Sequence, residues 1–154
     1  MRRPSQTCVD FILKDETLVS PARHLPADRP GVITGGYGET DPRRVHPGMI
    51  VSEQLAMQWF LADAQAISYS VEHMCAPILL TDGQFDALFS FTYNEGAHTL
   101  HESSILKYIH AGNFSAAADR FLVYDMANGR HLSHLLERRK VERSWFVRPD
   151  SIAA

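Results

Sequence analysis

Apolar residues recur at helical spacing through most of the chain after residue 50. Periods near 3.6 residues predict amphipathic helices, each preceded by a residue type that caps helix N-termini. The expected caps are Ser52, Thr81, Ser103 or Ser104, and Ser115, and the last helix is lined by Leu132, Leu135, Leu136, Val141 and Trp145. Thr81 and Gln84 have the spacing of a capping box. Gly96 and Gly112 are expected to end helices.

The first 50 residues have a different texture. Ser5 is expected to cap a short helix, and residues 17–50 hold most of the prolines and glycines. Because these residues break helices, the segment is expected to form turns and short strands, with Val32-Ile33-Thr34 as the best strand. The pattern predicts one domain of α+β class, with a first helix and a β lobe in residues 1–50 and a bundle of about five helices in residues 51–154.

Composition narrows the class of protein. With 154 residues, 45% hydrophobic and 21% charged, the chain is long and apolar enough to form a core. A net charge of −3 argues against a nucleic-acid binder. No apolar run is long enough to cross a membrane, and the N-terminal segment is too polar for a secretory signal, so the chain is expected to be made in the cytoplasm without an export signal of its own. Cys8 and Cys75 are expected to be reduced core thiols.

Basic residues gather near the C-terminus. Six lie between Arg130 and Arg148 against two acids, Glu137 and Glu142. This pattern predicts a solvated last helix, and contact with an anionic polymer is the alternative.

Three polar residues in the first 34 are candidates for chemistry. Glu16 falls where the first helix should end, Asp28 lies in a turn sequence, and Thr34 lies on the expected strand. A helix end followed by a hairpin can bring two carboxylates to opposite sides of one groove. Glycosidic cleavage needs such a pair, one protonated and one ionised, and a hydroxyl can hold the attacking water. Two acids near a turn are also typical of solvated surface, so the spacing alone leaves both interpretations open.

The residues from Asp28 to Thr40 resemble the active-site hairpin of the phage-type lysozymes, glycoside hydrolase family 24. In that family a Glu precedes an Asp, five residues separate the Asp from a Thr, and a Gly-Tyr-Gly turn follows. The interval from Asp28 to Thr34 matches, and Gly36-Tyr37-Gly38 supplies the turn. The resemblance extends along the chain. The family's helix before the catalytic Glu is matched by residues 12–16, and its Ala-Leu-x-Ser-Phe-x-x-Asn-x-Gly helix by residues 84–96. Its Ser-Thr-Leu-Leu motif is matched by residues 103–106, and its Leu-x-x-Arg-Arg-x-x-Glu helix by residues 136–142.

The chain departs from the family pattern around the acids. Eleven residues separate Glu16 from Asp28, where the family usually has eight. Pro26 replaces an aromatic residue, and Glu39 replaces a common His. Asp15 is the neighbouring rival of Glu16. An additional carboxylate at Glu39 would raise the pKa of a nearby acid if the hairpin folds back on the groove.

The resemblance implies a lysozyme-like fold with a groove between the two lobes, and a muramidase that cleaves the β-1,4 bond between N-acetylmuramic acid and N-acetylglucosamine. It implies that Glu16 is the general acid, that Asp28 stabilises positive charge or acts as a base toward water, and that Thr34 positions that water. Tyr37, Asn94 and Ser104 are expected to bind substrate, with bracing of the helices as the alternative for Asn94 and Ser104.

The resemblance also implies partners. Peptidoglycan glycan strands are the expected substrate, and a holin-type pore would release the protein, expected to be a monomer, to the wall at lysis. No cofactor is expected, and no metal, because the pairs His98/His101 and His131/His134 lack a third ligand. Two alternatives stay open: a lytic transglycosylase acting on the same bond, and a wall-binding module of lysozyme fold without activity.

Overall fold

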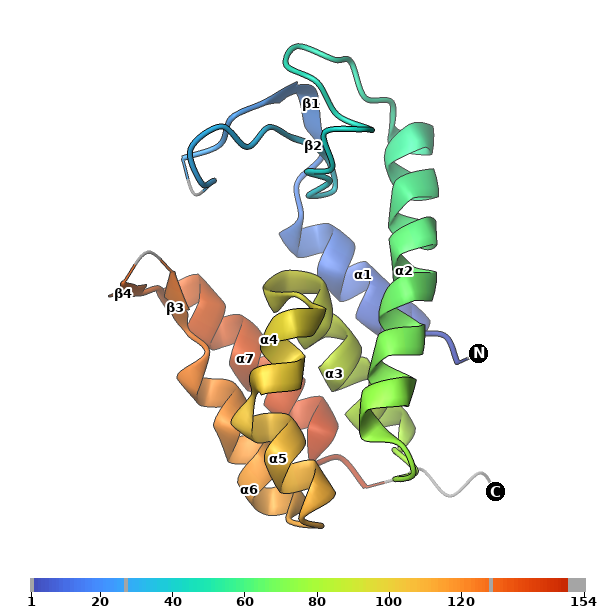
Figure 1. Ribbon diagram of the computed structural model, residues 1–154, viewed down its shortest axis with the longest axis vertical. Helices are drawn as coiled ribbons and strands as arrows, with labels where there is room; N and C mark the ends of the chain where they lie inside the picture. The colour runs from blue at the N-terminus through green and yellow to red at the C-terminus, as the bar shows by residue number, and fades with distance from the viewer. Residues whose placement is uncertain (1, 27, 128, 150–154) are drawn as a thin grey trace. The chain divides into compact units, whose positions relative to one another are not determined.

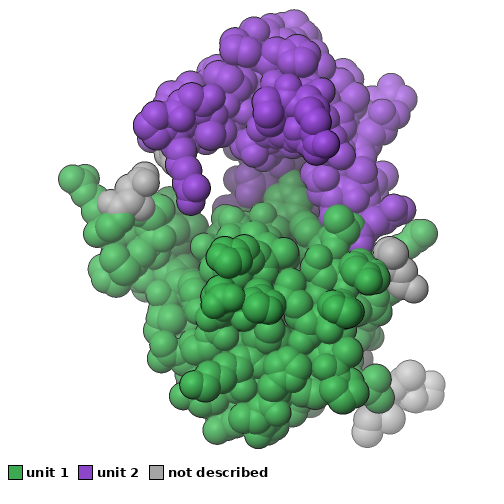
Figure 2. Space-filling model, viewed as in Figure 1, with its two compact units in different colours: residues 1–8, 66–154 green, residues 9–65 purple. Residues whose placement is uncertain are grey.

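The computed structural model describes residues 2–26, 28–127 and 129–149, and it is mostly helical with two small antiparallel sheets (Figure 1). This confirms the predicted α+β class. Two compact units divide the chain: unit 1 is Met1–Cys8 with Ala66–Ala154, and unit 2 is Val9–Gln65 (Figure 2). The elements in order are α1 (Gln6–Asp15), β1 (Val19–Arg23), β2 (Thr34–Gly36), α2 (Glu53–Cys75), α3 (Asp82–Glu95), α4 (Ala97–Glu102), α5 (Ser104–His110), α6 (Phe114–Arg120), the 3₁₀ helix η1 (Phe121–Val123), β3 (Met126–Ala127), β4 (Arg130–His131) and α7 (Ser133–Phe146).

The hairpin of unit 2 differs from the expected one. The strand predicted at residues 32–34 begins only at Thr34 and runs to Gly36, where it pairs irregularly with β1. The two glycines allow close backbone contacts: a Cβ at Gly35 would lie 3.0 Å from the Cβ of Ala22, and one at Gly36 would lie 3.1 Å from the Cβ of Ala56. The strand is therefore placed where the backbone must approach its neighbours, which β propensity does not detect.

A small apolar cluster supports this hairpin. Ala22, Val45, Val51 and Ala56 are buried together. Ile33, Tyr37 and Trp59 are among the partly buried residues that pack against it. Segment 48–49 also bonds to β1, because the Gly48 N–H donates to the Ala22 carbonyl (2.8 Å) and the Ala22 N–H donates to the Met49 carbonyl (2.8 Å).

Four of the predicted helix starts are confirmed by capping hydrogen bonds. The accepting hydroxyls are those of Ser5 (from Cys8 N–H, 3.2 Å), Ser52 (from Leu55 N–H, 3.2 Å), Thr81 (from Gln84 N–H, 3.1 Å) and Ser103 (from Leu106 N–H, 3.1 Å). Gln84 returns the bond of the capping box, and Gly96 ends α3 as expected. Helix α6 differs, because Asn113 caps it instead of Ser115.

Helix α3 forms the centre of unit 1. Its residues from Phe85 to Thr92 are all buried, and it packs against α7. The Phe91 ring meets the rings of Phe121 and Tyr124 edge to face, with centroids 5.6 and 5.0 Å apart. Gly83 makes the close approach to α7 possible, since a Cβ there would lie 2.3 Å from the Trp145 carbonyl oxygen.

The solvated last helix that the charge pattern predicts is wrong for two of its basic residues, whereas the side chains of Lys140 and Arg143 on the same helix are 53% and 41% exposed. Arg138 is only 3% exposed and Arg139 and Glu142 are fully buried. Glu142 lies between the two arginines, with Oε2 3.0 Å from Arg139 Nε and Oε1 3.3 Å from Arg138 Nε. It also accepts a hydrogen bond from the Ser90 hydroxyl on α3 (2.7 Å). A buried cation needs such anionic partners, so the charges pair internally.

Three further features bear on the expectations from the sequence. The hairpin of β3 and β4, which joins Met126 to His131 and Ala127 to Arg130, was not predicted from the sequence. Cys8 and Cys75 are buried and unbonded to each other, as expected. Among the helices described, none is both long enough and apolar enough to traverse a lipid bilayer.

Candidate active site

Glu16 lies directly after α1, where the sequence predicts it. Its N–H donates to the Ile12 carbonyl (2.9 Å), which continues the last helical turn by one residue. The side chain is half-buried and its carboxylate lies against the Gly36-Tyr37-Gly38 turn: a Cβ at Gly38 would be 3.3 Å from Glu16 Oε2. Gly38 has φ +87°, so a glycine both permits the turn and leaves room for the carboxylate.

Asp28 and Thr34 are joined by a hydrogen bond. The Thr34 hydroxyl donates to Asp28 Oδ2 (2.9 Å), and the Leu25 N–H donates to the same oxygen (2.8 Å). Thr34 is 4% exposed, so its hydroxyl has a fixed partner in a site with little bulk water. Ala27, within the predicted turn before Asp28, lies outside the described residues.

The two acids contact opposite ends of one short segment. Thr34 bonds Asp28, and Gly38, four residues later, lies against Glu16. The segment folds back on itself because Gly35 and Glu39 exchange two backbone hydrogen bonds, of 3.0 and 2.9 Å. Four extended residues would span at most about 13 Å, and the turn makes the span shorter.

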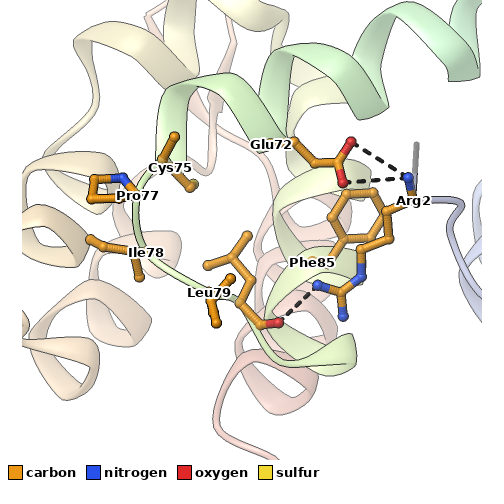
Figure 3. A pocket seen from close by; sticks show the side chains of 9 residues that line it. Arg2, Glu72, Cys75, Pro77, Ile78, Leu79 and Phe85 are labelled. Carbon is orange, nitrogen blue, oxygen red and sulfur yellow. Dashed lines mark hydrogen bonds between the residues drawn. The ribbon is translucent and has the colours of Figure 1, made fainter.

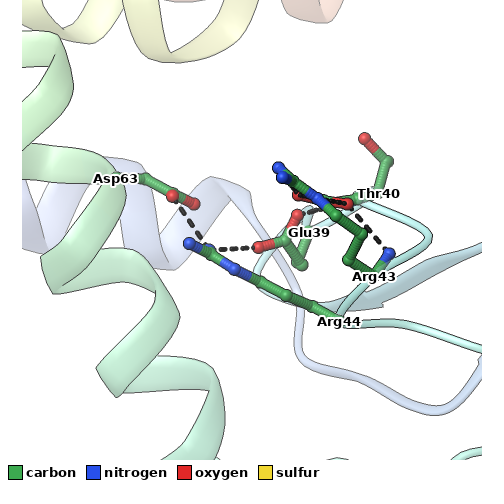
Figure 4. Close-up of polar contacts among 6 residues, drawn as sticks. Glu39, Thr40, Arg43, Arg44 and Asp63 are labelled. Atoms are coloured by element: carbon green, nitrogen blue, oxygen red, sulfur yellow. Dashed lines mark hydrogen bonds and ion pairs between the residues drawn. The ribbon is translucent and has the colours of Figure 1, made fainter.

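Glu39 has its own partners at this turn (Figure 4). One oxygen accepts the N–H groups of Thr40 and Asp41 (2.9 and 2.8 Å), and the other forms an ion pair with Arg44 (2.6 Å). Arg44 also pairs with Asp63 on α2 (3.0 Å). Burial raises the pKa of Asp63, and the charge of Glu39 raises it further. The nearby acid that Glu39 perturbs is therefore Asp63.

The expected substrate-binding residues lie in both units. Tyr37, in unit 2, packs against the apolar cluster around Ala22. Asn94, in unit 1, accepts a hydrogen bond from Arg139 Nη2 through its Oδ1 (2.6 Å). Ser104, also in unit 1, accepts one from Arg120 Nε (2.9 Å). Both of the latter side chains thus have internal partners, as a bracing role requires.

The contacts of Arg139 with α3 were not predicted from the sequence. Besides Asn94, Arg139 reaches Glu95 (3.5 Å) and stacks over the Phe91 ring, 4.9 Å from its centroid. Burial is the main cause that raises the pKa of Glu95. The spacing of Glu142 three residues after Arg139 is the signal in the sequence, because it places both side chains on one helix face.

The cavities in the described part of the chain are lined by residues other than Glu16, Asp28 and Thr34. One of about 310 Å³ in unit 1 is lined by Phe85, Leu79 and Arg2 among others (Figure 3). There the Arg2 guanidinium donates to the Leu80 carbonyl (2.8 Å) and lies over the Phe85 ring, 4.8 Å from its centroid. Another of about 480 Å³ in unit 2 is lined by residues 31–33, 40, 42 and 45–47. In the described part of the chain, no three His, Cys, Asp or Glu side chains gather as metal ligands.

A solved structure shares this fold. The muramidase domain of SpmX from Asticaccaulis excentricus superposes with a TM-score of 0.83 and 29% sequence identity, covering 97% of this chain and all of that domain. The fold is therefore of the lysozyme type.

Sequence comparisons give the same answer. Residues 18–142 match the family model described as phage lysozyme. The endolysin of Salmonella phage P22 is 31% identical over 79% of this chain and 84% of its own length. The endolysin of Bacillus phage B103 is 34% identical over 96% of this chain, which spans only 55% of that protein. The chain belongs to the phage lysozyme family.

Proposed function

We propose that the chain is a peptidoglycan hydrolase that cleaves the β-1,4 bond between N-acetylmuramic acid and N-acetylglucosamine. The observation that carries this proposal is the Thr34–Asp28 hydrogen bond at one end of a turn whose other end lies against the Glu16 carboxylate. One acid, an ionised partner and a hydroxyl meet the chemical needs of glycosidic hydrolysis. The names of the related endolysins and of the muramidase domain support the same substrate.

Each residue has a distinct role in the proposed reaction. Glu16 donates a proton to the leaving glycosidic oxygen, and ionised Asp28 stabilises the positive charge that develops on the sugar. Because the Thr34 hydroxyl gives its hydrogen to Asp28, its oxygen is left to accept a hydrogen bond from water. A water held in this way keeps a lone pair available for attack on the anomeric carbon, and the proton that the water loses passes to the Asp28 carboxylate.

A clearing assay on outer-membrane-permeabilised bacteria tests the proposal. The wild type is expected to clear the suspension, and Glu16→Gln is expected to be inactive because an amide cannot donate the proton. Asp15→Asn is the matched control, since it makes the same change at the exposed neighbouring residue. An inactive wild type would favour the wall-binding module. Inactive Asp15→Asn beside active Glu16→Gln would transfer the acid role to Asp15.

The products distinguish hydrolysis from transglycosylation. Hydrolysis adds water and leaves reducing muramic ends, while a transglycosylase closes an anhydro ring. Mass spectrometry of digested wall is expected to find reducing ends, and anhydro ends alone would overturn hydrolysis. Release through a holin-type pore and action as a monomer belong to the same proposal, and light scattering on the purified chain tests the monomer.

A further inference from the structure

Arg44 connects the turn beside Glu16 to helix α2 (Figure 4). Its Nη1 lies 2.6 Å from Glu39 Oε2 in the turn and 3.0 Å from Asp63 Oδ1 on α2. The Glu39 side chain is 9% exposed and that of Arg44 is 35% exposed, so water screens this pair less than a surface ion pair. A single guanidinium thus links two carboxylates from two different elements.

Glu39 transmits this link to the candidate site. Its own backbone is bonded twice to Gly35, the residue after Thr34. The residue before it, Gly38, lies against the Glu16 carboxylate. A displacement of Glu39 would therefore move the surface on which Glu16 rests and the strand that carries the Thr34 hydroxyl.

The same turn meets α2 at a second point. Gly36 has φ +61°, and a Cβ there would be 3.1 Å from the Ala56 Cβ and 3.3 Å from the Trp59 ring. This contact is apolar and has no hydrogen bond to fix its direction. The ion pair of Arg44 with Glu39 and Asp63 orients the turn on α2. Without Arg44, the negative charges of Glu39 and Asp63 would repel each other with no guanidinium between them.

We propose that Arg44 is a positioning residue, which holds the turn of residues 35–39 on α2 and so keeps the Glu16 carboxylate and the Thr34 hydroxyl in their reactive places. This inference rests on the proposed function. Arg44 touches no reacting group itself. Its effect is expected in the catalytic step, because the parts that it holds are those proposed to act on the bond.

The test compares two adjacent arginines. Arg44→Met is expected to lower kcat about 10-fold, with KM changed less than about two-fold, since a shift of about 1 Å at a reacting group can cost about 100-fold. Arg43→Met is the control: it removes the same charge from the same loop, but Arg43 pairs with Asp41 inside that loop and its side chain is 88% exposed. Arg44→Lys is expected to restore most of kcat, because an ammonium can also donate to both carboxylates.

Trp59 provides a spectroscopic readout independent of activity. The chain has two tryptophans, so Trp145→Phe leaves Trp59 as the sole reporter on the Gly36 contact. In this background Arg44→Met is expected to increase acrylamide quenching of Trp59, and Arg43→Met is expected to leave it unchanged. The Tm of every variant is measured in parallel, so that all assays are run well below the temperature at which any variant unfolds.

The outcomes separate the two proposals. An active wild type with an inactive Glu16→Gln, together with unchanged kcat and unchanged quenching in Arg44→Met, would overturn the positioning role and leave the function intact. An equal loss of kcat in Arg43→Met would assign the effect to loop charge and also overturn it. A wild type without activity would overturn the proposed function, while quenching would still report whether Arg44 holds the turn.

Discussion

Gly38→Ala tests whether the Glu16 carboxylate must occupy the space that this glycine leaves. Alanine at φ +87° costs about 1–2 kcal/mol, and a stiffer unfolded chain offsets about 0.4–1 kcal/mol of that. A net loss of about 1 kcal/mol lowers the Tm by about 2–4 °C for a chain of this length. The new Cβ would stand 3.3 Å from Glu16 Oε2, closer than ordinary contact, so the carboxylate must move a few tenths of an ångström. Scaled from about 100-fold per ångström, kcat should fall about 3–10-fold.

Gly48→Ala is the matched control for this prediction. Gly48 has φ +77° in the same unit, and a Cβ there would have nothing within 4 Å. The backbone penalty is therefore similar, but no catalytic group is displaced. Calorimetry should give both variants the same fall in Tm, and initial rates on solubilised peptidoglycan should fall for Gly38→Ala alone. Equal rates for the two variants would refute the reasoning that ties the position of Glu16 to this turn.

Three further predictions concern unit 1. Glu142→Gln should lower the free energy of unfolding in urea by about 3–5 kcal/mol, because it removes the carboxylate that two buried guanidinium groups share; a loss below about 1 kcal/mol would mean that other acids compensate. Asn94→Asp keeps an acceptor for Arg139 but removes the amide donors. KM should therefore rise several-fold, while the Tm stays unchanged or increases. An unchanged KM would remove Asn94 from substrate binding. Burial raises the pKa of Cys75 to about 11 and that of Cys8 well above its usual range, so Ellman's reagent at pH 8 should label neither thiol until guanidinium unfolds the chain. The same shift means that these thiols favour folding below the ordinary thiol pKa of about 9 and lose that contribution as the pH rises toward 11.

Local rules account for what could be predicted. A cap such as Ser5 or Thr81 bonds a residue three positions away, so the sequence itself contains both partners. The same holds for Asp28 and Thr34, six residues apart, whose predicted proximity became a hydrogen bond of 2.9 Å. Glu16 is placed at a helix end by the same short-range logic.

Contacts between residues far apart in the sequence account for the features that could not be predicted. The basic run predicts a solvated helix, and the spacing of Glu142 after Arg139 is its one local sign of an internal partner, because other acceptors of Arg138 and Arg139 lie outside the run. Those acceptors include Ser90 and Asn94 on α3, more than 40 residues away in sequence. The strand predicted at residues 32–34 was misplaced for a related reason. The close contacts of Gly35 with Ala22 and of Gly36 with Ala56 depend on other elements of the fold.

Substitutions of the proposed catalytic groups and substitutions of Asn94 should have different kinetic effects. The proposed proton donor, its ionised partner, the water-holding hydroxyl and the tether at Arg44 all belong to Val9–Gln65. Asn94 belongs to unit 1, where its Oδ1 accepts a hydrogen bond from Arg139 and its two amide hydrogens can be donated to a ligand. Substitutions in unit 2 should therefore reduce kcat, because they disturb bond-making groups held by one turn. Substitutions at Asn94 should act on KM, because an amide donor can bind a sugar oxygen equally in the ground state and the transition state.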